Sequence, residues 1–258
     1  MNHPCLDRGF VRLLAHMGSD ATICAAARIS YGADPSSPVE DERLIRYLLR
    51  NRHTSPFEMA ELQFHIKAPI FVARQWMRHR TASINEVSAR YKVLPDEVYI
   101  PDQIHGAPTS SKQGRGGAHP DSDRWRRGME AEAASALRRY REMISAGVAP
   151  EQARIVLPVG VYTEWVWKID LHNLLHFLSL RLHPHAQQEI RVYASAMAQM
   201  VAELFPLSWA AFLDYRLNAV TLSAPEIRTL RAVLEGVPPV PGHGRGEAAE
   251  WAELWGEA

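Results

Sequence analysis

Residues 159–169 read Val-Gly-Val-Tyr-Thr-Glu-Trp-Val-Trp-Lys-Ile, and an apolar side chain or Thr163 stands at every second position. Residues 62–67, Leu-Gln-Phe-His-Ile-Lys, show the same alternation. Successive side chains of a strand point to opposite faces, so each stretch predicts a strand with one buried and one wet face. The two strands flank residues 101–122, which are rich in Gly, Pro and Ser and predict a loop. Strands on both sides of this loop argue against a domain boundary there.

Helical periodicity dominates the rest of the chain. In residues 38–50, an acidic first turn is followed by Leu44, Ile45, Leu48 and Leu49 on one side. Residues 10–16 predict a third strand, and helices are predicted at residues 20–29, 38–50, 69–76, 124–144, 171–182, 186–204, 207–216 and from 224 onward. We therefore expect a single α+β domain over residues 1–220. Residues 221–258 are expected to form a peripheral helix and a tail, with a short tryptophan-bearing helix after Gly236.

The overall composition excludes several classes of protein. The chain has 258 residues, of which 47% are hydrophobic, and this is enough for a sizeable core. Its 29 basic and 29 acidic residues cancel, whereas a dedicated nucleic-acid-binding protein is usually basic. The N-terminus lacks a signal-peptide pattern, and no stretch is long and apolar enough to cross a membrane. We expect a cytoplasmic protein that binds neither nucleic acid nor membrane.

The stretch from Arg78 to Arg90, Arg-His-Arg-Thr-Ala-Ser-Ile-Asn-Glu-Val-Ser-Ala-Arg, is the strongest functional signal. Guanidinium groups match phosphate in charge and geometry, and the short polar side chains add donors and acceptors for a sugar or a base. The alternative is a solvated basic surface with one salt bridge. The variety of polar groups favours a site for a phosphorylated, hydroxyl-rich ligand, most simply a nucleotide.

A second group of polar residues lies in the predicted helix 171–182. Arg181 is four residues from Phe177 and leans toward the apolar side of this helix. A buried, unpaired guanidinium is costly, so Arg181 would need a ligand anion, a carboxylate or a polarised carbonyl. A side chain that reaches solvent at the helix end fits this segment equally well.

Two histidines of the same helix, His172 and His176, are one turn apart and could bind zinc on one face, with His185 nearby. The turn holds no acidic residue except Asp170, and no His-Glu-x-x-His motif occurs. Imidazoles that face solvent or a ligand are therefore the favoured interpretation.

Several common catalytic motifs are missing. The sequence contains no G-x-G-x-x-G, no glycine-lysine-serine/threonine phosphate loop and no G-x-S-x-G elbow. Neither Cys5 nor Cys24 has a base nearby in the sequence that would make it a nucleophile. An enzyme with this sequence would need a cofactor that is held by other means.

Separated motifs resemble those of the flavin-dependent thymidylate synthases. Arg78-His79-Arg80, followed after seven residues by Ser88, resembles the family signature. Residues 52–58, 153–158 and 180–190 resemble further family motifs in the same order, so the similarity covers about residues 10–216. The residues that extend the signature are Ser83, Asn85, Glu86, Arg90 and Tyr91.

The resemblance implies a fold, an assembly and a reaction. The fold would be an antiparallel sheet packed against long helices, assembled as a homotetramer with active sites at subunit interfaces. The reaction would be the reductive methylation of dUMP to dTMP, with methylenetetrahydrofolate as the carbon donor. Non-covalently bound FAD, reduced by NADPH, would supply the hydride, so that no cysteine nucleophile is needed.

The resemblance also assigns residues. FAD would be held by Ser55, Arg78, His79, Arg80, Glu86, Asp170, His172 and His176. The residues that would hold dUMP are Gln75, Arg78, Glu86, Ser88, Arg90, Arg154 and Arg181. Two residues would be catalytic: Arg181 against the uracil ring, where it can stabilise negative charge on N3 and O2 and so enrich C5, and His53 near flavin and folate. Some family members carry asparagine and arginine in place of Asp170 and His172, and asparagine in place of His176.

Two rival functions make different predictions. A nucleotide- or RNA-binding protein would be colourless and would bind with a strong salt dependence. A metalloenzyme centred on His172, His176 and His185 would carry stoichiometric zinc or iron. Zero net charge argues against the first rival, and the lack of clustered carboxylate or thiolate ligands argues against the second.

Overall fold

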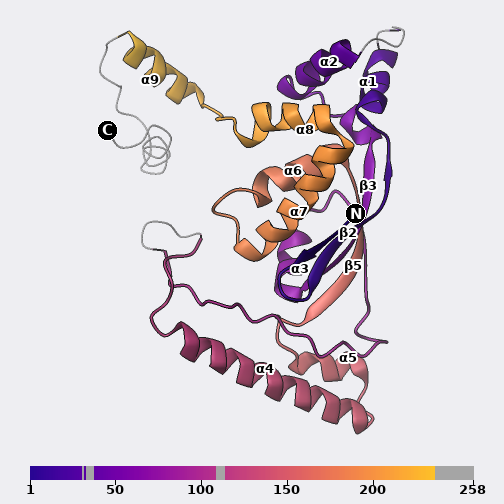
Figure 1. The fold of residues 1–258 in the computed structure, drawn as a ribbon, viewed down its shortest axis with the longest axis vertical. Coiled ribbons are helices and arrows are strands. Elements are labelled where there is room, and N and C mark those ends of the chain that lie inside the picture. Colours follow the sequence, from indigo (N-terminus) through magenta and orange to yellow (C-terminus); the bar gives the residue numbers. More distant parts are fainter. Residues whose placement is uncertain (31, 33–37, 109–113, 236–258) are drawn as a thin grey trace. The chain divides into compact units, whose positions relative to one another are not determined.

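The computed structural model describes residues 1–30, 32, 38–108 and 114–235 (Figure 1). The chain divides into two compact units, Met1–Leu217 and Asn218–Ala258. In the second unit the described helix is α9 (Ala224–Leu234), and the Glu226 carboxylate accepts a hydrogen bond from the backbone amide of Ser223 before its first turn. The helix predicted from residue 224 is confirmed, whereas the helix predicted after Gly236 lies outside the described residues.

The described strands form one antiparallel sheet in the order β1-β2-β3-β5-β4. β3 and β5 pair along their whole length, from Glu61 opposite Asp170 to Pro69 opposite Tyr162. The α+β architecture with an antiparallel sheet is therefore confirmed. The strands are β1 (Asn2–Cys5), β2 (Gly9–Met17), β3 (Glu61–Pro69), β4 (Ser83–Glu86) and β5 (Tyr162–Asp170).

The alternating sequence of β3 and β5 produces the predicted buried face. Phe64 of β3 lies opposite Trp167 of β5, and both side chains are fully buried. Trp76, at the end of the helix that follows β3, contacts Trp165 and Trp167 edge-on, with ring centroids 5.4 and 5.3 Å apart. This aromatic cluster fixes the end of that helix against the sheet.

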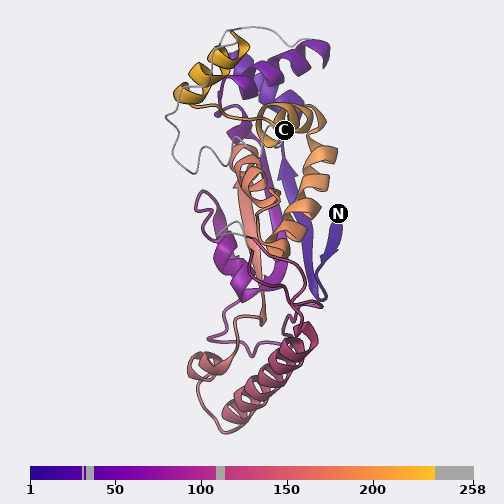
Figure 2. The same cartoon turned by 90° about the vertical axis from the view of Figure 1, so that its left-hand side faces the viewer.

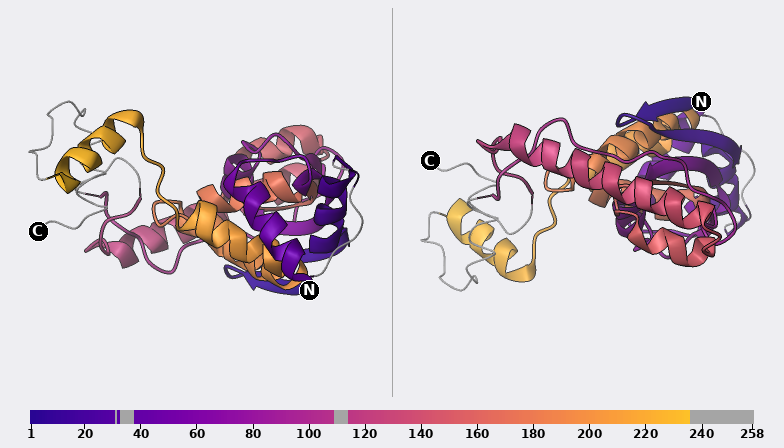
Figure 3. Two further views of the ribbon diagram at one scale, coloured as in Figure 1. Left: turned by 90° about the horizontal axis from the view of Figure 1, so that it is seen from above. Right: turned by 90° about the horizontal axis from the view of Figure 1, so that it is seen from below.

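Helices α6 and α7 lie over one face of the sheet, while α4 and α5 lie beyond one end of β5 (Figures 1 and 2). Seen from below in Figure 3, α4 crosses in front of that end.

Within the described residues, no helix is both long and apolar enough to span a membrane. The helices of the first unit are α1 (Asp20–Ile29), α2 (Pro38–Arg50), α3 (Ile70–Trp76), α4 (Ser122–Ser145), α5 (Pro150–Ala153), α6 (Leu171–Arg181), α7 (Gln188–Leu204) and α8 (Pro206–Phe212). Shorter segments are the 3₁₀-helices Phe57–Met59 and Arg154–Val156 and the π-helix Leu213–Leu217.

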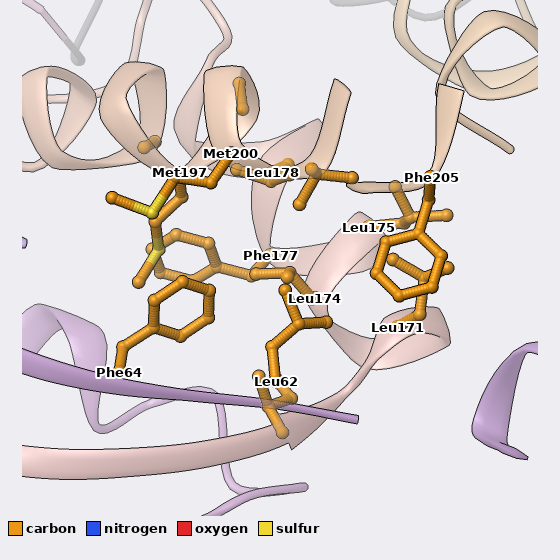
Figure 4. Close-up of a cluster of buried hydrophobic side chains, with 14 of the residues drawn as sticks. Leu62, Phe64, Leu171, Leu174, Leu175, Phe177, Leu178, Met197, Met200 and Phe205 are labelled. Atoms are coloured by element: carbon orange, nitrogen blue, oxygen red, sulfur yellow. The ribbon is translucent and has the colours of Figure 1, made fainter. Parts of the chain in front are cut away.

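Part of the hydrophobic core lies between the sheet and helices α6 and α7 (Figure 4). Leu174 and Phe177 of α6 point toward Leu62 and Phe64 of β3, and Met197 of α7 closes the cluster from the far side. Burial on this scale stabilises a fold by roughly 25 cal/mol for each Å² of apolar surface removed from water. The apolar side of α6 is thereby fixed, so its polar side is presented outward.

The structure differs from the sequence predictions at several elements. β1 and β4 were not predicted, and β5 begins at Tyr162 rather than near residue 159. Gln75 and Arg78 are three residues apart and would share a helix side if the helix continued, but α3 ends at Trp76 and Arg78 lies in the following turn. The apolar side chains of α4 are buried only in part: Leu137 and Tyr140 are buried, whereas Trp125 is 48% exposed.

Candidate functional site

The arginine-rich stretch occupies a turn and an edge strand. After α3, the amide of His79 donates to the carbonyl of Trp76 at 3.0 Å and turns the chain back. The chain then enters β4, an edge strand of the described sheet, which pairs with β5 from Ser83 opposite Lys168 to Glu86 opposite Trp165. All four residues of β4 are exposed. The polar groups of β4 therefore lie on the surface of the described chain.

A hydrogen bond between Arg181 and His79 joins the polar residues of α6 to the arginine-rich stretch. The Nε of Arg181 donates to Nε2 of His79 at 3.0 Å. Burial is the largest of three causes that together lower the pKa of His79 to about 4, and the charges of Arg181 and His176 are the other two. At neutral pH the imidazole is therefore uncharged and can accept this hydrogen bond. Burial also lowers the pKa of Arg181 from its ordinary value, so this guanidinium is held in a poorly solvated place.

A cavity of about 390 Å³ opens between the end of α2 and the polar side of α6. It brings together His53, His172 and His176, which the sequence placed near the flavin. Its apolar lining includes Phe57 and Leu175. The cavity thus combines imidazole groups with flat apolar walls.

Arg52 lines the same cavity and was missed by sequence reasoning. Its backbone has φ +60°, in the left-handed region that favours glycine. The amides of Arg52 and His53 donate to the carbonyls of Leu49 and Leu48, which is the pattern that ends a helix with a left-handed residue. Arginine at this position is strained, and such strain often accompanies a functional role. Its position directly before His53 was the available signal.

A second cavity, of about 900 Å³, contains Gln75 and Arg181. Ser179 lines both cavities, so the C-terminal half of α6 forms the wall between them. The Oε1 atom of Gln75 is buried and has no hydrogen-bond partner in the described part of the chain. A buried unsatisfied acceptor is costly, so a ligand that donates to it would be stabilised.

The other predicted dUMP residues gather elsewhere. Arg90 forms an ion pair with Glu151, with Nε and Oε2 3.3 Å apart, and its backbone amide donates to Oγ of Ser88 at 3.3 Å. Arg154 begins the 3₁₀-helix that follows α5 and is exposed. None of Ser88, Arg90 and Arg154 is among the residues that line the second cavity. In the described chain, the residues predicted to hold dUMP therefore do not all line one cavity.

The remaining predicted flavin residues have varied surroundings. Oε1 of Glu86 accepts from Oγ1 of Thr163 at 2.6 Å. Asp170 caps α6: its carboxylate accepts from the backbone amide of Asn173 at 2.9 Å and from the side-chain amide of the same residue at 2.7 Å. The exposed residues of this set are Ser55, Arg78, Arg80 and Glu86.

Cys5 and Cys24 are both buried, and burial raises the pKa of each thiol to about 12. A thiol with such a pKa is not ionised at neutral pH and is a poor nucleophile. Among the described residues, no group of three His, Cys, Asp or Glu side chains has the arrangement of a metal site.

Comparisons with known proteins agree with this geometry. A family model described as "thymidylate synthase complementing protein" matches residues 12–207. The chain is 50% identical over 260 residues to a flavin-dependent thymidylate synthase of Ruegeria pomeroyi, covering 98% of this chain and 86% of that protein. It is 53% identical over 233 residues to a flavin-dependent thymidylate synthase of Thermus thermophilus, covering 90% of this chain and 85% of that protein.

A solved structure is similar as well. The UMP/dUMP methylase PolB of Streptomyces cacaoi, bound with 5-Br dUMP, superposes with a TM-score of 0.76 at 34% identity, covering 83% of this chain and 98% of that one. The family resemblance read from the separated motifs is thus confirmed. Because the family model spans most of the chain and the relatives are about half identical to it, the chain belongs to the thymidylate synthase complementing protein family, that of the flavin-dependent thymidylate synthases.

Proposed function

We propose that this enzyme reductively methylates dUMP to dTMP, with methylenetetrahydrofolate as the carbon donor and FAD, reduced by NADPH, as the hydride source. The observation that carries the proposal is the poorly solvated Arg181, held by neutral His79 in a cavity with Gln75. His79 orients the guanidinium without neutralising its charge. The positive charge of Arg181 is therefore available to a substrate.

The residues present fit a flavin. The first cavity joins Phe57 and Leu175, which suit a flat aromatic ring, to the imidazoles of His53, His172 and His176. The ring edge of a flavin carries donors and acceptors that such imidazoles can meet. Arg52 and the exposed Arg78 and Arg80 provide charge for a pyrophosphate. Bound FAD, once reduced, would supply the hydride that completes the methyl group.

Arg181 is proposed to act on the uracil ring. Its guanidinium at the N3–O2 edge would stabilise negative charge that develops there, and so raise electron density at C5, the atom that takes the carbon. The free Oε1 of Gln75 can accept a hydrogen bond from the nucleotide in the same cavity. The un-ionised thiols of Cys5 and Cys24 are consistent with chemistry that uses no cysteine.

We also propose that the enzyme is a homotetramer with active sites at its interfaces, and that residues 1–220 form the catalytic domain. In one subunit Gln75 and Arg181 lie in a cavity that Ser88, Arg90 and Arg154 do not line. A second subunit that presents this other group to the cavity would complete the substrate site. The exposure of β4, which carries part of the signature motif, supports this arrangement.

The proposal is tested by a visible absorbance spectrum of the purified protein, recorded before and after dUMP is added. Flavin bands that shift with dUMP are expected, because the two ligands would share one site. Arg181→Ala should retain these bands and lose dTMP formation, since the guanidinium acts on the uracil and not on the flavin. A colourless protein that does not take up added FAD would overturn the proposal, and loss of FAD from Arg181→Ala would overturn the role of that residue.

A further inference from the structure

The second cavity is strongly basic. Arg115, Arg181 and Arg191 line it together with His105, His183 and His185. Among the described lining residues there is no aspartate or glutamate. The proposed function uses only Arg181 and Gln75 of this lining, so most of its basic residues have no role in that function.

Two of the three arginines have no carboxylate partner in the described part of the chain. Arg115 pairs with Glu189, whose side chain is 5% exposed. Arg181 instead donates to a neutral imidazole. Arg191 donates from Nη1 to the carbonyl of Pro184 at 2.7 Å, which is a neutral acceptor. The cavity therefore holds two guanidinium charges that nothing in the described subunit neutralises, and this favours an anionic ligand.

The wall that carries these charges is ordered by specific contacts. The hydrogen bond from Arg191 to Pro184 ties α7 to the turn before it, and in this turn the amide of Ala186 donates to the carbonyl of His183 at 2.8 Å. The turn leads into the first residues of α7, a 17-residue helix with no side-chain cap at Gln187. Amide groups at such an uncapped helix start add to the positive potential that the arginines create.

The opposite wall is anchored to the same helix. Arg115 bonds Oε1 of Gln188 at 3.2 Å as well as the carboxylate of Glu189. Tyr99 adds a second bond to Glu189, with its hydroxyl 3.3 Å from Oε1. The Glu189 carboxylate thus lies behind the wall and holds Arg115 in place, while the guanidinium borders the cavity. The basic lining is positioned before any ligand arrives.

We propose that the part of this cavity around Arg191 binds a phosphate monoester of a substrate, and this inference rests on the proposed function. A phosphate monoester carries a charge of about −1.5 to −2 near neutral pH, which suits a guanidinium, neighbouring imidazoles and a helix start. With Arg181 directed to the uracil, Arg191 is the lining arginine left without an anion. Two substrates of the proposed reaction carry this group: dUMP at its 5′ position and NADPH at its 2′ position.

The test compares Arg191→Gln with a matched control in the FAD-loaded enzyme. Arg126→Gln serves as the control, because Arg126 pairs with Glu130 on the exposed side of α4 and does not line the cavity. Affinities for dUMP and for deoxyuridine, which lacks the phosphate, are measured by calorimetry. Flavin reduction is measured against the concentration of NADPH and of NADH, which lacks the 2′-phosphate.

The expected result is a selective loss of affinity for the phosphorylated ligand. Removal of a charge-assisted hydrogen bond should weaken it by about 10- to 100-fold. A loss for dUMP but not deoxyuridine identifies the nucleotide as the source, and a loss for NADPH but not NADH identifies the reductant. Arg126→Gln should match the unaltered enzyme in all four measurements.

Two results would overturn the inference: unchanged affinities, or equal losses for each ligand that carries the phosphate monoester and for its counterpart that lacks it. Arg191→Met, which keeps the apolar stem of the side chain, repeats the test if Arg191→Gln does not fold. Failure of the proposed function is distinguished because the unaltered protein would then lack FAD or dTMP formation. If the unaltered enzyme is active and Arg191→Gln leaves the affinities unchanged, only this inference is overturned.

Discussion

At the residue scale, the hydrogen bond between Arg181 and His79 requires a neutral imidazole, because only an unprotonated ring nitrogen can accept from a guanidinium. His79 packs against Phe177, with ring centroids 4.8 Å apart, so the protonated ring would be poorly solvated. The His79 ring therefore positions the proposed catalytic arginine only while it stays uncharged. The sequence could reveal the importance of both residues but not their contact, since they lie about a hundred residues apart in the chain.

This arrangement predicts a pH dependence of stability. The pKa of His79 falls from 6.5 to about 4 on folding, so between these values the unfolded chain binds more protons than the folded one. The stabilisation from the neutral ring is complete above about pH 6.5 and is lost as the pH falls toward 4. Urea unfolding at a series of pH values should show that His79→Gln, which cannot be protonated, loses less stability over this range than the unaltered protein. Parallel losses in the two proteins would contradict the assignment.

Arg52 gives a second prediction at this scale. Its left-handed backbone costs on the order of 1 kcal/mol for a residue with a side chain, and glycine would remove this strain while adding freedom to the unfolded chain. Arg52→Gly should therefore change the free energy of unfolding by less than about 1 kcal/mol. Loss of the guanidinium from the first cavity should weaken FAD binding on the order of tenfold.

The measurements for Arg52 are urea unfolding and the FAD content after dialysis. Arg52→Lys keeps the charge and the strain, and it should retain FAD better than Arg52→Gly. Equal FAD retention by the two variants would show that Arg52 is not used by the flavin.

At the scale of elements, the start of α8 is capped by a residue from a different helix. The Asp20 carboxylate, 7% exposed at the first turn of α1, accepts from the amides of Leu207 and Ser208 at 2.8 and 3.1 Å, and from Oγ of Ser208 at 2.6 Å. α8 has no side-chain cap of its own. Asp20 therefore supplies the hydrogen-bond acceptors for the free backbone amides in the first turn of α8. It links α1, near the start of the first unit, to α8, near its end.

Asp20→Ala should lower the free energy of unfolding by about 3 kcal/mol, because buried donors lose their acceptor. Asp123→Ala is the matched control: Asp123 is also a carboxylate in the first turn of a helix, but it is exposed and should change stability by no more than about 1 kcal/mol. Urea unfolding monitored by circular dichroism measures both. A loss for Asp20→Ala as small as that of the control would contradict the capping role.

The elements that sequence reasoning found are those whose own residues carry the signal. α1 and α2 have the predicted bounds, since capping residues and acidic first turns mark their starts. β4 was missed because all its residues are exposed, and an edge strand with no buried face shows no useful alternation. α3 ends at Trp76, as predicted, but the packing of Trp76 against the tryptophans of β5 is a tertiary contact that local periodicity does not contain.

At the scale of the whole molecule, we propose that the site is divided between subunits. His53, His172 and His176, which the motifs assign to the flavin or its surroundings, line one cavity, and Gln75 and Arg181, which the motifs assign to dUMP, line another. The motifs could not show that Ser88, Arg90 and Arg154 do not line the cavity of Gln75, because a family motif lists the residues of a site without saying how one chain arranges them.

Complementation tests this division. Arg90→Ala and Arg181→Ala should each be inactive alone, but co-expression should restore activity. If the two residues come from different subunits, random mixing leaves on the order of a quarter of the sites with both arginines. The assay is dTMP formation by co-expressed variants, compared with each variant co-expressed with a tagged copy of itself. No recovery in verified mixed oligomers would show that both residues of a site belong to one subunit.

The pairing of β3 with β5 has a consequence for synthesis on the ribosome. β3 is made about a hundred residues before β5, with which it pairs from end to end. At about 5–20 residues per second, the nascent β3 waits several seconds with one edge and the apolar faces of Leu62, Phe64 and Ile66 uncovered. An open edge of this kind can pair with another chain. Slower translation of the intervening segment, or depletion of chaperones, should therefore increase aggregation of the newly made chains. The free energy of unfolding of the folded protein should stay the same.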